Sequence, residues 1–117
     1  MKTSNLFRLA VLCTFSVVAL SMSAFAAEKK ESVKVWGNCG MCKKTIDGAL
    51  KGVEGVSSAS WNKSTKMLDV TYDDSKISMK KIEEKVAASG YDTQNVKGAD
   101  AAYDGLKKCC KYDRKKS

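Results

Sequence analysis

The sequence predicts an α+β domain in which an antiparallel four-stranded sheet carries two helices on one face. Three observations point to this class. Apolar residues that alternate with polar ones mark short strands, apolar residues at helical spacing mark two amphipathic helices, and glycines or polar turns separate these segments. The resulting order is β-α-β-β-α-β, the split βαβ arrangement of a ferredoxin-like sandwich.

The first strand is predicted over residues 32–36, where polar and apolar side chains alternate until Gly37 breaks the pattern. The first helix should begin at Cys42 and end near Gly52 and Gly55. Its apolar positions recur at the i, i+3, i+4, i+7 spacing of one helix face, with charged residues on the other face. These apolar positions are Ile46, Ala49, Leu50 and Val53.

Two further strands, residues 56–61 and 67–72, lie on either side of a short polar segment, which is a pattern typical of a β-hairpin. A second helix follows, with Ser78 as its N-cap and Gly90 as its end. Residues 91–96 are expected to form the fourth strand. The core should consist mainly of Val33, Val35, Ile46, Leu50, Val56, Leu68, Val70, Ile82 and Val86.

The first 26 residues have the pattern of a secretory signal peptide. Lys2 and Arg8 give this segment a basic start, residues 9–22 are mostly apolar, and Ala24-Phe25-Ala26 fits the small-x-small cleavage rule. The apolar run is shorter than the roughly 20 residues that a membrane-spanning helix needs. We therefore expect a periplasmic or secreted protein that is not held in a membrane after cleavage, and in which Cys13 has no role.

Cleavage after Ala26 would leave 91 of the 117 residues and would remove two of the 21 basic ones, so that the net charge falls from +8 to +6. This length suits one small domain, residues 27–97, followed by a separate basic tail, residues 98–117. Within the tail, residues 101–106 could form a short helix, and the basic end, residues 107–117, is expected to be mobile. The excess of basic residues either forms a solvated surface or steers the protein toward an acidic partner. The protein is expected to be a monomer. Few aromatic residues accompany the basic runs, so nucleic-acid binding is not expected.

Cys39 and Cys42 place two thiols three residues apart near the start of the predicted helix. Such a pair can bind a metal ion, form a local disulfide or catalyse thiol-disulfide exchange. The chain has no histidine, which excludes Cys2His2 zinc sites, haem attachment and Cys-His catalytic pairs. It also has no proline, whereas a thioredoxin-like enzyme places a cis-proline opposite its paired cysteines. These observations favour a metal site, and thiolates prefer soft ions such as Cu(I), which accepts as few as two sulfur ligands.

Residues 33–42, with the sequence VKVWGNCGMC, are followed at characteristic spacing by Ile46, Gly55-Val56, Val70-Thr71-Tyr72-Asp73 and Gly90-Tyr91-Asp92. Together these stretches resemble the heavy-metal-associated domain, a family that includes copper chaperones, the amino-terminal domains of copper-transporting ATPases and the periplasmic mercury-binding protein. The resemblance covers residues 31–96. It is greatest to the exported bacterial branch, whose loop has the sequence Gly-Asn-Cys-Gly-Met-Cys.

The resemblance implies that Cys39 and Cys42 are the metal ligands and that Tyr91 lies near the metal and limits its access to solvent. One difference concerns the loop before the first cysteine. The family usually has Gly-Met-x there, and this chain has Trp36-Gly37-Asn38, so the methionine that anchors the loop in the core is absent. Trp36 or Met41 could take over this packing role.

Cys109 and Cys110 could act as additional metal ligands that fold back onto the loop, as partners in intermolecular disulfides, or as a pair unconnected with the loop. The expected function is the binding and transfer of a soft metal ion without a catalysed reaction. Cu(I) is the preferred ion, and Hg(II), Zn(II) and Cd(II) are alternatives. The expected partner is a metal-transporting or metal-accepting protein with a cysteine-rich site. A mercury scavenger and a thiol-disulfide exchange protein are the alternative functions.

Overall fold

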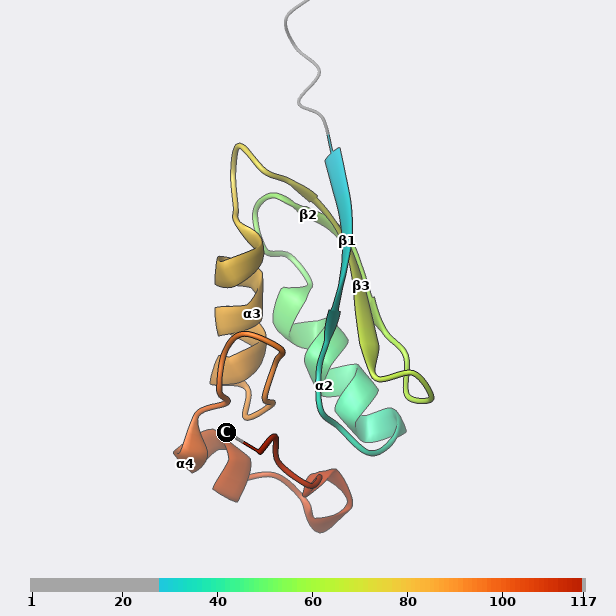
Figure 1. Ribbon diagram of the computed structural model, residues 1–117, viewed down its shortest axis with the longest axis vertical. Helices are drawn as coiled ribbons and strands as arrows, with labels where there is room; N and C mark the ends of the chain where they lie inside the picture. Colours follow the sequence, from blue (N-terminus) through green and yellow to red (C-terminus); the bar gives the residue numbers. More distant parts are fainter. Residues whose placement is uncertain (1–27, 117) are drawn as a thin grey trace, which may run out of the picture.

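The structure, a computed structural model, describes residues 28–116, so the predicted signal peptide lies outside the described residues. These residues form two layers, a sheet and the helices α2 and α3 packed on one of its faces (Figure 1). The elements in chain order are β1 (Glu28–Lys34), α2 (Gly40–Leu50), β2 (Val56–Trp61), β3 (Met67–Asp73), α3 (Met79–Ala88), α4 (Asp100–Asp104) and the short 3-10 helix η2 (Lys108–Cys110). The predicted α+β class is confirmed.

The sheet has the strand order β1-β3-β2, and both neighbouring pairs are antiparallel. β2 and β3 form the expected hairpin, with Ala59 opposite Val70, and β1 lies along the other side of β3, with Val33 opposite Leu68. The predicted core residues are buried, except for Val56, which is partly buried. The buried apolar side chains are Val33, Val35, Cys42, Ile46, Leu50, Trp61, Leu68, Val70, Tyr72, Ile82, Val86, Ala87, Tyr91, Cys110 and Tyr112.

The fourth strand expected over residues 91–96 does not form a ladder. Within the part of the chain that the structure describes, this segment makes one antiparallel bridge, between Thr93 and Val35. Backbone hydrogen bonds of 2.8 and 2.9 Å flank the bridge, but Thr93 N then donates to Val96 O at 2.8 Å and closes a turn. Pairing stops on both sides of the bridge, since Lys34 N donates to Gln94 Oε1 at 3.4 Å and Asp92 N donates to the hydroxyl of Tyr112 at 2.8 Å. The sheet of the described residues therefore has three strands where the sequence predicted four.

The ends of α3 follow the sequence closely. Ser78 caps the helix as predicted, since its side chain accepts a hydrogen bond from Lys81 N at 3.2 Å. Gly90 follows the helix with a φ of 101°, a conformation that favours glycine. A Cβ atom at Gly90 would lie only 2.8 Å from the carbonyl carbon of Ala102. Gly90 therefore ends α3 and also lets α4 pack closely against it.

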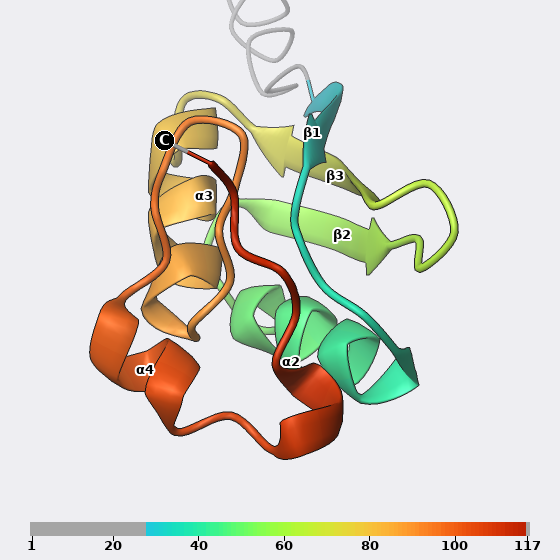
Figure 2. The ribbon, with the colours of Figure 1, turned by 60° about the horizontal axis from the view of Figure 1, so that its bottom comes forward.

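The segment after Gly98, expected to lie apart from the domain, instead packs against it. The chain passes the start of α2 as η2 and returns along the body of the domain (Figure 2). Tyr112 is 2% exposed and belongs to the core, and Arg114 forms an ion pair with the buried Asp92 at 2.8 Å. Residues 105–116, called the C-terminal strap below, are part of the folded unit.

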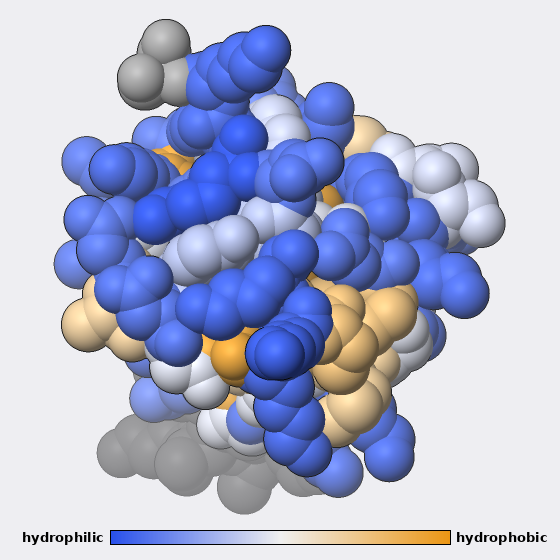
Figure 3. Space-filling view, turned by 90° about the horizontal axis from the view of Figure 1, so that it is seen from below, coloured by the Kyte–Doolittle hydropathy of each residue, from blue (hydrophilic) through white to orange (hydrophobic). Residues whose placement is uncertain are grey.

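The end of the molecule that carries α4 and η2 is seen face on in Figure 3, where hydrophilic side chains cover most of the surface and smaller hydrophobic areas lie between them. Within residues 28–116, Met41 is the one large hydrophobic side chain that is exposed. No helix in the same range is long and apolar enough to cross a bilayer.

Candidate metal centre

Two of the predicted site residues are positioned by the start of α2. Cys39 occupies the N-cap position with extended backbone (φ −143°, ψ −179°), and Cys42 lies in the first turn of a helix that begins at Gly40, two residues earlier than predicted. Cys42 is fully buried and Cys39 is partly exposed. Their Sγ atoms are 3.7 Å apart, well beyond the roughly 2.05 Å of a disulfide bond. Both thiols are therefore free.

The start of α2 also supplies hydrogen-bond donors to both sulfur atoms. Asn38 N donates to Cys42 Sγ at 3.4 Å. The backbone N–H of Cys42 lowers the pKa of the Cys39 thiol to about 7, with burial opposing the effect and the N–H of Met41 adding to it. Free N–H groups and the positive end of a helix stabilise a thiolate in this way. Cys39 therefore loses its proton more readily than an ordinary cysteine, and the thiolate is the form that binds soft metal ions.

Cys110 brings a third sulfur to this pair. The Sγ atoms of Cys39, Cys42 and Cys110 all lie within 4.8 Å of one another. Cys110 is 4% exposed, and burial, followed by its contact with Cys42, raises the pKa of its thiol to about 12. The sequence alone left the position of this cysteine open, because Cys110 lies 68 positions after Cys42 in the chain.

Cys109, the neighbour of Cys110, lies outside the three-sulfur group. Its side chain is exposed, and its Sγ atom is 3.7 Å from Met41 Sδ and 3.9 Å from Cys110 Sγ. Only its backbone reaches the paired cysteines, since Cys39 Sγ donates to Cys109 O at 3.4 Å. The structure therefore separates two adjacent cysteines that the sequence could only treat as a pair.

Tyr91, which the resemblance placed near the metal, lies beside the thiols and is fully buried. Its hydroxyl group has no hydrogen-bond partner among the described residues. Burial strongly raises the pKa of this hydroxyl, and the adjacent Cys42 and Cys110 thiols raise it further. The phenol remains neutral beside the sulfur cluster. A buried hydroxyl without a partner is unusual, and here it faces the two buried sulfur atoms.

Neither Trp36 nor Met41, the two residues expected to replace the family methionine, is fully buried, and the buried aromatic side chain beside the loop is Trp61. Met41 is 43% exposed, and Trp36 is only partly buried. Trp61 is fully buried and donates from Nε1 to Val35 O at 3.0 Å. Its ring lies directly under the loop, because a Cβ atom at Gly37 would come within 2.9 Å of it. The sequence feature that could have indicated this packing is a large aromatic residue, Trp61, at the end of a predicted hairpin strand.

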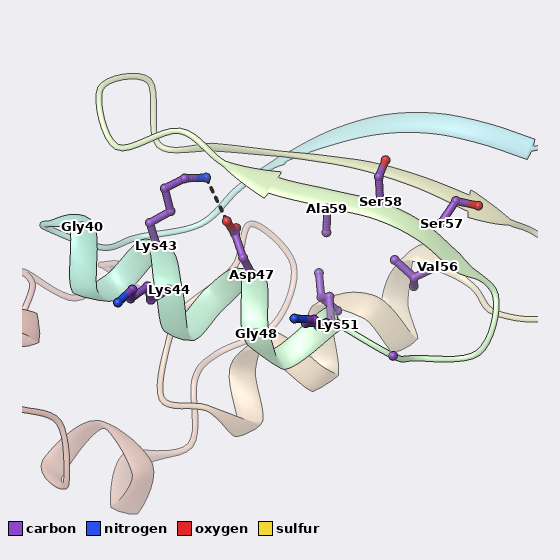
Figure 4. A pocket seen from close by; sticks show the side chains of 12 residues that line it. Gly40, Lys43, Lys44, Asp47, Gly48, Lys51, Val56, Ser57, Ser58 and Ala59 are labelled. Atoms are coloured by element: carbon purple, nitrogen blue, oxygen red, sulfur yellow. Dashed lines mark hydrogen bonds and ion pairs between the residues drawn. The ribbon is translucent and has the colours of Figure 1, made fainter.

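A hollow between α2 and β2 lies next to the centre but contains none of its cysteines (Figure 4). Lys43, Lys44 and Lys51 line it, as does Asp47. The side chain of Lys43 lies at the surface with its Nζ atom tied down, since this atom contacts Asp47 Oδ2 at 2.8 Å and Trp61 O at 3.0 Å. The basic side chains beside the loop lie at the surface, as the sequence indicated, and Lys43 is also fixed by its contacts.

The fold and the paired thiols define a small α+β domain that can bind a soft metal ion through cysteine sulfur. The chain belongs to the heavy-metal-associated domain family: the family profile described as "Heavy-metal-associated domain" matches residues 38–92. The match includes both cysteines of the loop and Tyr91, and it ends before the C-terminal strap.

Individual relatives agree with this assignment. The copper chaperone CopZ of Staphylococcus aureus (strain JH9) is 36% identical over 55 residues, which are 47% of this chain and 81% of CopZ. A crystal structure of oxidized MerP from Ralstonia metallidurans CH34 superposes with a TM-score of 0.55 at 33% identity, covering 58% of this chain and 96% of MerP. The water-soluble region of the P-type ATPase CopA from Bacillus subtilis gives a TM-score of 0.54 at 31% identity, covering 57% of this chain and 45% of the CopA chain.

Proposed function

We propose that this protein carries a soft metal ion, Cu(I), and delivers it to another protein, with Cys39 and Cys42 holding the ion. One observation carries the proposal. Two free thiols with Sγ atoms 3.7 Å apart lie at the positive end of an 11-residue helix. Thiolates so close together suit Cu(I), which prefers sulfur over oxygen and nitrogen ligands and needs few of them.

The unequal exposure of the two thiols suits transfer by ligand exchange. A thiolate of the acceptor reaches the ion from the side of the partly exposed Cys39 and forms a bond to it. The bond to Cys39 then breaks, while the buried Cys42 holds the ion until the last step. The charge of the ion does not change, and the proton released by each arriving thiol is matched by one taken up by the departing thiolate. The protein catalyses no reaction in this exchange.

The proposed partner is a metal-transporting protein with a cysteine-rich site. The similarity to the copper chaperone CopZ and to the soluble region of the P-type ATPase CopA supports this choice. We further propose that the protein works as a monomer in the periplasm or after secretion, on the basis of the signal-peptide pattern in residues 1–26. Empty thiols tend to pair in such a compartment, so bound metal or a reductant would keep them available.

The test is an anaerobic Cu(I) titration of the reduced protein, produced from the full chain, against a competing chelator. We expect tight one-to-one binding that is lost when Cys39→Ser and Cys42→Ser are combined. Cys109→Ser is the matched control, because it removes an exposed thiol outside the three-sulfur group. Tight binding by the double variant would refute the proposed ligands.

A second candidate function is the capture of Hg(II) by the same thiols. The structural similarity to MerP and the resemblance of the loop to the mercury-binding branch of the family favour it. The metal content of protein purified from its own compartment separates the two functions. Copper bound to the purified protein supports the function as a Cu(I) carrier. Mercury in place of copper, found only in protein from cells exposed to mercury, supports the function as a mercury scavenger.

A further inference from the structure

We infer that Cys110 is a third thiolate ligand of the metal ion, held in place by the C-terminal strap, and that it occupies the position an acceptor's thiolate must take. This inference rests on the proposed function, since it concerns the ion bound by Cys39 and Cys42. It turns a two-sulfur site into a three-sulfur site whose third ligand belongs to a separate part of the chain.

The spacing of the sulfur atoms suits a three-coordinate ion. With metal–sulfur bonds of about 2.3 Å, a trigonal ion places its three sulfurs about 4 Å apart. The Sγ atoms of Cys39 and Cys42 are 3.7 Å apart, and those of all three cysteines lie within 4.8 Å of one another. Small side-chain movements are therefore sufficient for three bonds to one ion.

The strap fixes Cys110 through the residues that follow it. The hydroxyl of Tyr112 donates to Gly90 O at 2.7 Å and accepts from Asp92 N at 2.8 Å. Arg114 then binds the carboxylate of Asp92 through two nitrogen atoms, at 2.8 and 3.2 Å. Because these contacts already order the strap, the third thiol is brought to the ion without the entropy loss that a mobile tail would suffer.

The same strap also lies against Cys39, the partly exposed member of the pair. Cys109 O accepts a hydrogen bond from Cys39 Sγ at 3.4 Å, so the strap backbone lies against the thiol through which an acceptor must approach. Cys110 Sγ fills the space next to it. The strap therefore narrows the approach to the ion beside Cys39, and its hold on Asp92 and Gly90 sets how readily this approach widens.

Transfer then begins with one exchange that needs no oxidant or reductant. The acceptor's thiol loses its proton and forms a bond to the ion, the bond between the ion and Cys110 Sγ breaks, and the Cys110 thiolate takes up a proton as it returns to its buried position. The ions retained in this way are those that accept three sulfur ligands. Cu(I) does so, and thiolate-rich sites also suit Hg(II) and Cd(II).

The test compares Cys110→Ala with Cys109→Ala in the protein produced from the full chain. X-ray absorption of the Cu(I)-loaded protein should give about three sulfur neighbours for the wild type and for Cys109→Ala, and about two for Cys110→Ala. Cu(I) affinity, measured against a competing chelator, should fall about tenfold or more in Cys110→Ala, since losing a ligand costs no less than losing a group that only orients one.

Arg114→Ala provides a second measurement that leaves every sulfur in place. It should release Cu(I) to a chelator several-fold faster, with the sulfur count unchanged. Thermal melting shows whether each variant is folded. If Cys110→Ala does not fold, the Cu(I) release rate of Arg114→Ala still tests the inference. A sulfur count of two in the wild type, or equal affinity of the Cys110→Ala and Cys109→Ala variants, would overturn the inference while leaving Cys39 and Cys42 as ligands. Failure of the wild type to bind Cu(I) would instead overturn the proposed function.

Discussion

The ring of Tyr112 stacks on the ring of Tyr91, with centroids 5.5 Å apart and planes inclined by 16°. Tyr91 lies beside the buried thiols, and Tyr112 belongs to the strap that carries Cys110. The family match covers residues 38–92. This contact thus joins the core of the family domain to a segment that lies outside that match. Stacked aromatic pairs of this kind add about 0.5–1.5 kcal/mol beyond the burial of their area.

The hydroxyl of Tyr112 should stabilise the domain measurably. Tyr112→Phe removes both of its hydrogen bonds and leaves Gly90 O and Asp92 N buried without a partner. We expect the free energy of unfolding to fall by about 2 kcal/mol, as measured by urea denaturation. The control is Tyr103→Phe. The partly buried Tyr103 donates one hydrogen bond from its hydroxyl to Tyr112 O at 2.7 Å, and the variant loses it. A larger loss in the control than in Tyr112→Phe would contradict this view of the strap.

The ion pair between Asp92 and Arg114 should make stability depend on acid pH. Burial alone would raise the pKa of Asp92, but Arg114 and the backbone N–H groups of Gly98 and Lys115 outweigh it and hold the pKa below its usual 3.8. A carboxyl with a lowered folded-state pKa adds stability above its unfolded-state pKa, and that stability is lost as pH falls through the folded-state value. We expect unfolding curves to show this loss below about pH 4.

The Asp92→Asn variant is the test of that assignment. It removes the titrating group while keeping an acceptor oxygen for Gly98 N, which donates to Asp92 Oδ1 at 2.7 Å. Its stability should be lower than that of the wild type at neutral pH and should change less between pH 5 and pH 2, a range that spans the usual carboxyl pKa of about 3.9. An acid dependence as steep as that of the wild type would show that other carboxyl groups cause it.

The loop before Cys39 should tolerate no side chain at Gly37. A Cβ atom there would come within 2.9 Å of the Trp61 ring, so Gly37→Ala should cost about 1–3 kcal/mol and shift the loop. Gly40→Ala is the matched control, because a Cβ at Gly40 meets no atom within 4 Å. Thermal melting and Cu(I) affinity of the two variants provide the comparison, and equal stability would show that Trp61 can move aside.

Cys39 and Cys110, the two proposed ligands with shifted pKa values, should react differently with an alkylating reagent. The thiolate is the reactive form, so modification of Cys39 by iodoacetamide should rise with pH and reach half its maximum rate near pH 7, in line with its pKa of about 7. Cys110, buried and with a pKa raised to about 12, should react far more slowly across the same range. Mass spectrometry of the metal-free protein, site by site, measures both rates. Similar rates at pH 7 would contradict the arrangement at the start of α2.

Much of the fold could be predicted because its causes act over a few residues. The strand β3, the cap at Ser78 and the end of α3 at Gly90 follow from the alternation of Leu68, Val70 and Tyr72, from one side-chain hydrogen bond and from a positive φ angle. The fourth strand was wrongly predicted, because the two backbone donors that would extend the ladder, Lys34 N and Asp92 N, bind the side chains of Gln94 and Tyr112 instead, and alternation does not reveal such contacts.

The sequence by itself determined the α+β order of elements and placed Cys39 and Cys42 together at one helix start, since three residues of spacing leave two thiols little freedom to separate. Only the tertiary structure decided that Cys110 joins them and that Cys109 does not. The position of Cys110 depends on contacts that Tyr112 and Arg114 make with residues 20 to 22 positions earlier in the chain. Contacts at that distance depend on packing, burial and ion pairing in the folded domain, which local sequence patterns do not encode.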